Sequence, residues 1–128
     1  IINLFIDKMT KNEEIIIYDN GVVLRDFVYI SDIIEVIKHA INLKSNLTLN
    51  IATGKSKSIM EILGHIEKAI HSKAKVNFLE SNHIQFDMKF DISKLKNFMP
   101  NFKPTIMEEG IRKNIEKKFS NTSLSNNN

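Results

Sequence analysis

Apolar residues recur along the chain with two periods, and each period predicts a different kind of element. Stretches in which apolar residues alternate or run together between Gly, Asn or Asp residues predict strands at 15–18, 27–30, 47–51 and 76–79. Stretches in which apolar residues return every three or four positions predict helices at 2–9, 31–41, 58–70, 91–98 and 105–119. From residue 15 onward, the order β-β-α-β-α-β-α-α predicts an α/β fold with at least one parallel pair of strands.

Capping residues mark where most of these helices begin. A Ser, Thr or Asp side chain can accept a hydrogen bond from the N–H groups of the first turn, and a Glu three residues later closes a capping box. Such residues stand before four of the helical stretches: Ser31 or Asp32 with Glu35, Ser58 with Glu61, Asp91, and Thr105 with Glu108. Capping therefore accounts for the hydroxyls of Ser58 and Thr105 without a catalytic role.

The two ends of the chain differ in character. Helical spacing starts at Ile2 with no capping residue and no initiator methionine ahead of it, which predicts a chain cut from a longer protein whose missing part lies upstream. Residues 120–128 form a polar Ser/Asn tail without periodicity, which predicts a disordered terminus. Residues 1–119 are therefore expected to form one structural unit, either a domain or part of one.

Composition argues against several classes of protein. The formal net charge is only +3, and no basic run is interleaved with aromatic residues, so nucleic-acid binding is not favoured. The chain has no cysteine, which excludes disulfides and thiolate metal sites and fits a cytoplasmic protein. No apolar run approaches the length of a membrane span and no cleavable leader precedes the first helix, so we expect a soluble protein without membrane partners.

Catalytic constellations are scarce. The four histidines are isolated, and no His, Asp and Glu set repeats at metal-ligand spacing, so we predict no metal site. His39 and His65 fall in predicted helices away from the main apolar stripes, where solvated side chains are expected. The segment Thr53-Gly54-Lys55-Ser56 is superficially similar to a phosphate-binding loop but lacks the first glycine of that pattern. We therefore do not assign it to phosphate.

Arg25 has the most informative surroundings. The chain carries only two arginines, and this one follows an Asn20-Gly21 turn and opens the segment RDFVYISD, in which a predicted strand leads to a helix start. A guanidinium fixed beside an apolar strand suits phosphate or carboxylate, because it presents a planar fork of donors. The alternative is an ion pair or a charge at the edge of a strand.

The order of these motifs resembles the C-terminal part of extended short-chain dehydrogenase/reductases, the NAD-dependent nucleotide-sugar epimerases and dehydratases. The similar segments cover nearly all of residues 1–119 and read IINLFIDKM, IIIYDNGVVLRDFVYISDI, LNIATGKSKSIMEI, DISKLKNFMPNFKP and MEEGIRKNIE. The resemblance implies a Rossmann-type α/β enzyme, of which this chain is the C-terminal part that includes the small substrate-binding region. It also implies that the glycine-rich dinucleotide loop and the Tyr-x-x-x-Lys catalytic pair lie upstream, so this chain alone is not expected to transfer a hydride.

The resemblance further implies which residues meet a nucleotide-sugar substrate. Arg25 matches the family arginine that holds the diphosphate. Ile16 and Tyr18 match strand positions beside the nucleobase, with core packing as the alternative. Asn50 matches a family asparagine that either reaches the phosphates or pins the neighbouring loop. The expected cofactor is NAD, with NADP possible, and homodimers would form through upstream helices.

One departure from the family pattern leaves the nucleotide open. Many members carry Arg-Pro-Gly-Asp where this chain reads Ser81-Asn82-His83-Ile84, so the second arginine and its acidic partner are absent.

Two alternatives to an enzyme part remain. A non-catalytic remnant or stand-alone binding module would keep the fold without the reaction, and a nucleic-acid-binding domain would bind DNA or RNA with strong salt dependence.

Overall fold

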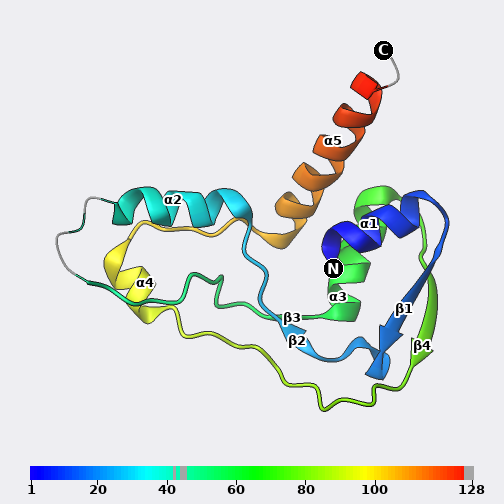
Figure 1. Cartoon of the computed structure of the whole chain (residues 1–128), viewed down its shortest axis with the longest axis horizontal. Coiled ribbons are helices and arrows are strands. Elements are labelled where there is room, and N and C mark those ends of the chain that lie inside the picture. Colours follow the sequence, from blue (N-terminus) through cyan, green and yellow to red (C-terminus); the bar gives the residue numbers. More distant parts are fainter. Residues whose placement is uncertain (42, 44–45, 126–128) are drawn as a thin grey trace.

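A computed structural model describes residues 1–41, 43 and 46–125 of the 128-residue chain. Helices and strands alternate along it, so the protein has the predicted α/β character (Figure 1). The elements in chain order are α1 (Ile2–Thr10), β1 (Glu14–Tyr18), the 3₁₀ turn η1 (Asp19–Gly21), β2 (Leu24–Arg25), α2 (Ile30–Ala40), β3 (Lys57–Ser58), α3 (Ile59–Ile70), β4 (Lys75–Leu79), α4 (Ser93–Phe98) and α5 (Met107–Ser125).

The two longest strands form the parallel pair that the sequence predicts. β1 and β4 run side by side, with Ile15 opposite Val76 and Ile17 opposite Phe78. Ile15 and Ile17 are buried, whereas Ile16 and Tyr18 project from the other face of the strand, as the two-residue period requires. The short strands β2 and β3 form a separate antiparallel pair.

Two apolar clusters make up the core. The first joins β1 to α1, α3 and the start of α5, and its buried residues are Phe5, Ile6, Ile15, Ile17, Ile62, Leu63, Ile66 and Ile111. The second joins α2 to α4 and their flanking loops, at the opposite end of the molecule from β1 and β4 (Figure 1), and contains Val36, Ala52, Ile92, Leu95, Met99 and Phe102. The candidate site lies beside the first cluster, along β1, η1 and β2.

Two predicted strands are wrong. Residues 27–29 belong to no strand, and α2 already begins at Ile30. Residues 47–51 also belong to no strand. A strand is defined by its ladder of hydrogen bonds to a neighbour, and alternating apolar residues without a neighbouring strand do not form one. The pairing near Arg25 instead involves Leu24–Arg25, a little earlier than the predicted start at residue 27.

The helix caps are partly as predicted. The Ser58 and Glu61 capping box is confirmed, since the Glu61 N–H donates to Ser58 Oγ and the Ser58 N–H donates to Glu61 Oε2. Asp91 accepts from the N–H of Ser93, the first residue of α4. The caps assigned to Asp32 and Thr105 are wrong, because these two side chains bond to each other across the fold.

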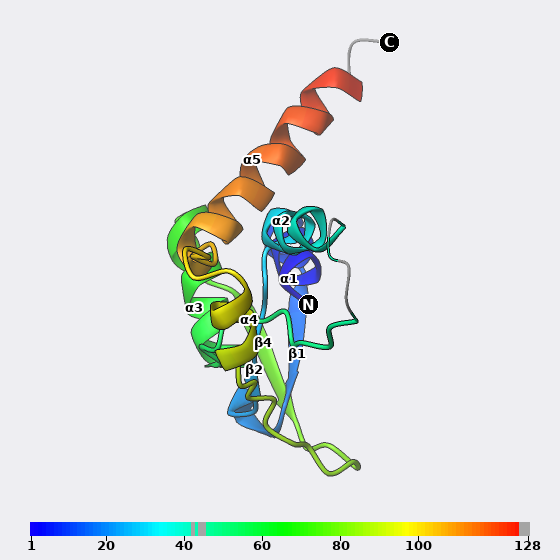
Figure 2. The same cartoon turned by 90° about the vertical axis from the view of Figure 1, so that its left-hand side faces the viewer.

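The C-terminal helix is longer than the sequence predicts. α5 runs to Ser125 and therefore includes residues 120–125, which were expected to belong to the disordered tail. Residues 126–128 of that tail lie outside the described residues. Both views show α5 extending away from the other elements (Figures 1 and 2).

Candidate functional site

A tight turn shapes the entrance to the candidate site. In η1, Asp19, Asn20 and Gly21 all have positive φ angles, of 50°, 55° and 64°. A Cβ on Gly21 would lie 2.8 Å from Ile17 Cγ2, so both the conformation and the close packing favour glycine here. Asp19 Oδ1 also accepts from the Ser81 N–H at 2.8 Å, which ties the turn to the segment after β4.

Arg25 reaches from β2 to that same downstream segment. Its Nη1 donates to the backbone carbonyl of Phe86 at 2.6 Å and to that of Leu24 at 2.9 Å. Its Nη2 donates to Gln85 Oε1 at 3.3 Å. The half-buried guanidinium therefore serves as a bridge between β2 and residues 85–86, and not as a strand-edge charge alone.

The guanidinium keeps donors on its other edge. Arginine has five N–H donors, two on each Nη and one on Nε. The two bonds from Nη1 use both of its donors, and the bond to Gln85 uses one of the two on Nη2. In the described part of the chain, Nε and the second Nη2 donor have no partner, and together they can meet an anionic oxygen pair.

Ile16, Tyr18 and Arg25 line one pocket, which we call the Arg25 pocket. Its volume is about 170 Å³, and its other lining residues are Ile1, Phe5, Ile17, Gly21, Val23, Ile59 and Gln85. Ile16 and Tyr18 are 45% and 50% exposed, so neither belongs to the core formed by the described residues. The structure thus brings together three of the four residues that the sequence analysis selected.

Asn50, the fourth residue, does not line the Arg25 pocket. Its Nδ2 donates to the backbone carbonyl of Asp91 at 3.2 Å. This bond fits the alternative in which the asparagine pins a neighbouring loop.

Asp87 was not selected from the sequence, yet it holds the wall of the site. Its Oδ1 accepts from the Leu24 N–H at 3.0 Å, and the Met88 N–H donates to the Leu24 carbonyl at 3.0 Å. The bond from Leu24 lowers the pKa of Asp87, with Lys89 and Arg25 acting in the same direction. The sequence does not signal this contact, because Leu24 and Asp87 are 63 residues apart and residues 82–90 belong to no helix or strand.

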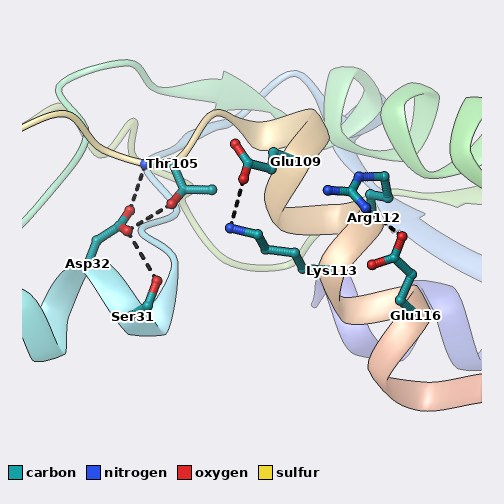
Figure 3. Close-up of polar contacts among 7 residues, drawn as sticks. All are labelled: Ser31, Asp32, Thr105, Glu109, Arg112, Lys113 and Glu116. Carbon is teal, nitrogen blue, oxygen red and sulfur yellow. Dashed lines mark hydrogen bonds and ion pairs between the residues drawn. The ribbon is translucent and has the colours of Figure 1, made fainter. Parts of the chain in front are cut away.

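Two aspartates of the RDFVYISD segment fasten distant parts of the chain. Asp26 accepts from the N–H and Oγ1 of Thr53 at 2.9 and 2.8 Å and from the Gly54 N–H at 2.8 Å. Asp32, only 6% exposed, accepts from the N–H and Oγ1 of Thr105 at 2.7 and 2.8 Å (Figure 3). The segment on either side of Phe27 is therefore anchored to the loop before β3 and to the start of α5.

The remaining polar candidates have ordinary structural partners. The second arginine, Arg112, pairs with Glu116 along α5 (Figure 3). His65 Nδ1 lies 3.3 Å from Glu108 Oε1, and His39 packs edge-on against Phe98. Within residues 1–41, 43 and 46–125, no three His, Asp or Glu side chains gather as metal ligands, and no helix has the length and apolar character to cross a membrane.

The residues present do not fit the dinucleotide of a Rossmann enzyme. Its pyrophosphate is held by glycines in the turn from a strand into a helix. The four glycines of this chain lie elsewhere: Gly21 in η1, Gly54 in the loop before β3, and Gly64 and Gly110 inside α3 and α5. A dinucleotide would have to be bound by residues other than these.

Comparison with known proteins gives consistent matches. Residues 1–52 match the NAD dependent epimerase/dehydratase family. A putative UDP-glucose 4-epimerase of Methanocaldococcus jannaschii is 33% identical over 115 residues, covering 88% of this chain and 37% of the relative.

Solved structures agree with the sequence matches. The UDP-N-acetylglucosamine 4-epimerase of Methanobrevibacter ruminantium M1, in complex with UDP-N-acetylmuramic acid, superposes with a TM-score of 0.84 and 28% identity, covering 94% of this chain and 39% of that one. The UDP-glucuronic acid 4-epimerase of Bacillus cereus, in complex with UDP-glucuronic acid and NAD, gives a TM-score of 0.78 and 27% identity. The match covers 91% of this chain and 40% of the epimerase. The chain thus spans roughly two fifths of the length of the proteins it matches.

Proposed function

Because the chain belongs to the NAD-dependent epimerase/dehydratase family and corresponds to the C-terminal portion of its members, we propose that it binds the nucleotide half of a nucleotide sugar. The whole protein would carry out an NAD-dependent epimerisation or dehydration of that sugar. The observation that carries the proposal is the Arg25 pocket, in which an arginine with two uncommitted donors lies beside Ile16 and Tyr18.

The Arg25 pocket supplies two kinds of contact that a nucleotide needs. The Nε edge of Arg25 can donate to diphosphate oxygens, and charge-assisted bonds of this kind are among the strongest in proteins. Ile16 and Tyr18 offer an exposed, largely apolar strand face on which a planar base can rest. The pocket of about 170 Å³ is smaller than a whole nucleotide sugar, so the sugar would extend out of it.

The internal bonds of Arg25 support the same role. By holding the carbonyl of Phe86 and the side chain of Gln85, Arg25 fixes both its own orientation and the adjoining wall of the pocket. A guanidinium that is already ordered loses less entropy when it meets phosphate. Orienting a bound sugar against a reacting group can contribute as much as about 7–11 kcal/mol to lowering a reaction barrier.

The finer features of the protein follow from this proposal. NAD, with NADP as the alternative, would be held outside the described residues, since these do not form its glycine-rich cradle. The B. cereus relative was solved with NAD, which supports that choice of cofactor. A cytoplasmic, soluble enzyme fits the absence of cysteine, and pairing through upstream helices would make it a homodimer. Nucleotide sugars of this class would serve polysaccharide biosynthesis.

The test is steady-state kinetics of the full-length natural protein with UDP-glucose, UDP-glucuronic acid and UDP-N-acetylglucosamine, with product sugars identified by NMR. We expect Arg25→Ala to raise KM by about 10- to 100-fold, as expected for lost charged hydrogen bonds, and to leave NAD affinity unchanged. Arg112→Ala is the matched control, because it removes the other arginine, which is exposed on α5.

Two results would contradict the proposal. One is turnover of none of these sugars together with no binding of UDP, which would favour the stand-alone binding module. The other is a loss of NAD affinity in Arg25→Ala, which would place the arginine at the cofactor. Arg25→Lys separates charge from geometry, since lysine keeps the charge but lacks the planar fork.

A further inference from the structure

A second pocket lies where Phe27 and residues 53–57 meet two later segments of the chain, and four lysines line it. Residues 53–57, 92–96 and 102–108 contribute to its walls, and its volume is about 470 Å³. We call it the lysine pocket. Its charged lining residues within the described chain are Lys55, Lys57, Lys96, Lys103 and a single carboxylate, Glu108.

The two aspartate anchors hold the walls of the lysine pocket in place. Asp26 fixes Thr53 on one side through two hydrogen bonds, and Asp32 fixes Thr105 on the other side through two more. Both threonines line the pocket, and so does Phe27, which lies between the anchors in the sequence. The pocket is therefore part of the folded framework and not a gap between loose loops.

The positive charges around the lysine pocket are poorly compensated. Lys57 lies 4.0 Å from Glu61, which is the outer limit of an ion pair. Among the described residues, neither Lys55 nor Lys103 has a carboxylate within that distance. Positive charges that line one concave surface concentrate a positive potential there. An anion bound in the pocket would reduce the repulsion between the lysines.

The two threonines and several apolar side chains form the rest of the lining. Phe27 contributes aromatic surface, whereas Phe102 belongs to the core and is only 8% exposed. Ile92 packs against Gly54, where an added Cβ would lie 3.0 Å from Ile92 Cδ1. A volume of this size is in the range of small-molecule sites, in which apolar walls carry a few polar groups. The combination suits a ligand that has a flat apolar part and several negative charges.

We propose that the lysine pocket binds a nucleoside polyphosphate, with the phosphates among Lys55, Lys96 and Lys103 and the base against Phe27. This site is separate from the Arg25 pocket, because the two share no lining residue. The inference does not depend on the proposed nucleotide-sugar function.

The test uses the full-length natural protein saturated with NAD and UDP, so that a cofactor site and the Arg25 pocket are filled. ATP is the probe, and isothermal titration calorimetry is the measurement. We expect about one further ATP to bind per chain, with an affinity that falls as KCl is raised. The double variant Lys55→Ala/Lys103→Ala should weaken ATP binding about tenfold or more. Both side chains are exposed, so the fold should be retained.

Lys11→Ala/Lys38→Ala is the matched control, because it removes the same charge from two exposed positions outside the lysine pocket. Equal weakening in both double variants would overturn the inference, since it would reflect net charge alone. Loss of ATP binding in Arg25→Ala with full binding in Lys55→Ala/Lys103→Ala would also overturn it, by placing ATP in the Arg25 pocket. Absence of ATP binding at low salt would also overturn the inference, and this result can be read independently of whether UDP binds.

Discussion

Arg25 and Phe86 are 61 residues apart in the sequence, and Arg25 Nη1 donates to the Phe86 carbonyl at 2.6 Å. This bond makes the arginine a support for the wall of the pocket, while its Nε edge stays available as a candidate phosphate ligand. The two roles use different edges of one guanidinium, which a lysine ammonium could not provide.

Asp26 is expected to contribute strongly to stability. Asp26→Ala would leave the N–H groups of Thr53 and Gly54 without their acceptor, and the free energy of unfolding should fall by about 2–4 kcal/mol. Urea unfolding of the full-length protein, followed by circular dichroism, measures the change. Glu80→Ala, at an exposed position, should change it by less than about 0.5 kcal/mol. Equal effects of the two substitutions would refute the anchoring role of Asp26.

The contact between Asp32 and Thr105 should appear as an energetic coupling. In a double-mutant cycle with Asp32→Ala and Thr105→Val, we expect a coupling of about 1–2 kcal/mol, because the hydroxyl donates to a buried carboxylate at 2.8 Å. The cycle between Asp32→Ala and Ser31→Ala is the comparison, since the Ser31 hydroxyl lies 3.3 Å away (Figure 3). A coupling no larger for Thr105 than for Ser31 would show that the contact is unimportant.

Glu61 should make stability depend on pH. The N–H and hydroxyl of Ser58 hold the pKa of Glu61 below its usual 4.5. A carboxyl whose pKa is lower in the folded state stabilises the protein above the unfolded pKa, and the gain is lost as pH falls through the folded pKa. Below about pH 4.5, stability should therefore fall less steeply in Glu61→Gln than in the unaltered protein.

Thermal unfolding across that acidic range measures the difference. Glu80→Gln is the control, as it removes an exposed carboxyl outside any capping box. If the stability of Glu61→Gln and of the unaltered protein changed with pH in the same way, the Ser58 and Glu61 capping box would not persist in solution.

Local signals in the sequence predict the local structure well. The Ser58 and Glu61 box and the helical stripe of α3 follow from residues close together in the chain. The parallel pair β1 and β4 follows instead from the order of the elements, since its paired residues, such as Glu14 and Lys75, are far apart in the sequence. The placement of Ile16 and Tyr18 opposite the buried face of β1 follows from the same two-residue period.

Contacts between distant residues explain where prediction failed. Asp32 and Thr105 each precede an apolar helical stripe and so have the pattern of a cap, but their side chains bond to each other. Residues 27–29 and 47–51 have strand-like composition and lack a neighbouring strand. The bonds from Arg25 to Gln85 and Phe86 are equally invisible in the sequence, because they join residues 60 and 61 apart. Ile84, Phe86, Met88 and Phe90 alternate with polar residues as in a strand, yet this segment forms none.

The bond between Asp32 and Thr105 spans 73 residues, and this has a consequence for synthesis on the ribosome. Asp32 leaves the ribosome long before Thr105 exists, so its carboxylate must stay hydrated while the intervening chain is made. Closing so long a loop also carries an entropic cost that later contacts must offset. α2 therefore cannot bury the charge of Asp32 against Thr105 until Thr105 itself, 73 residues later, has been translated.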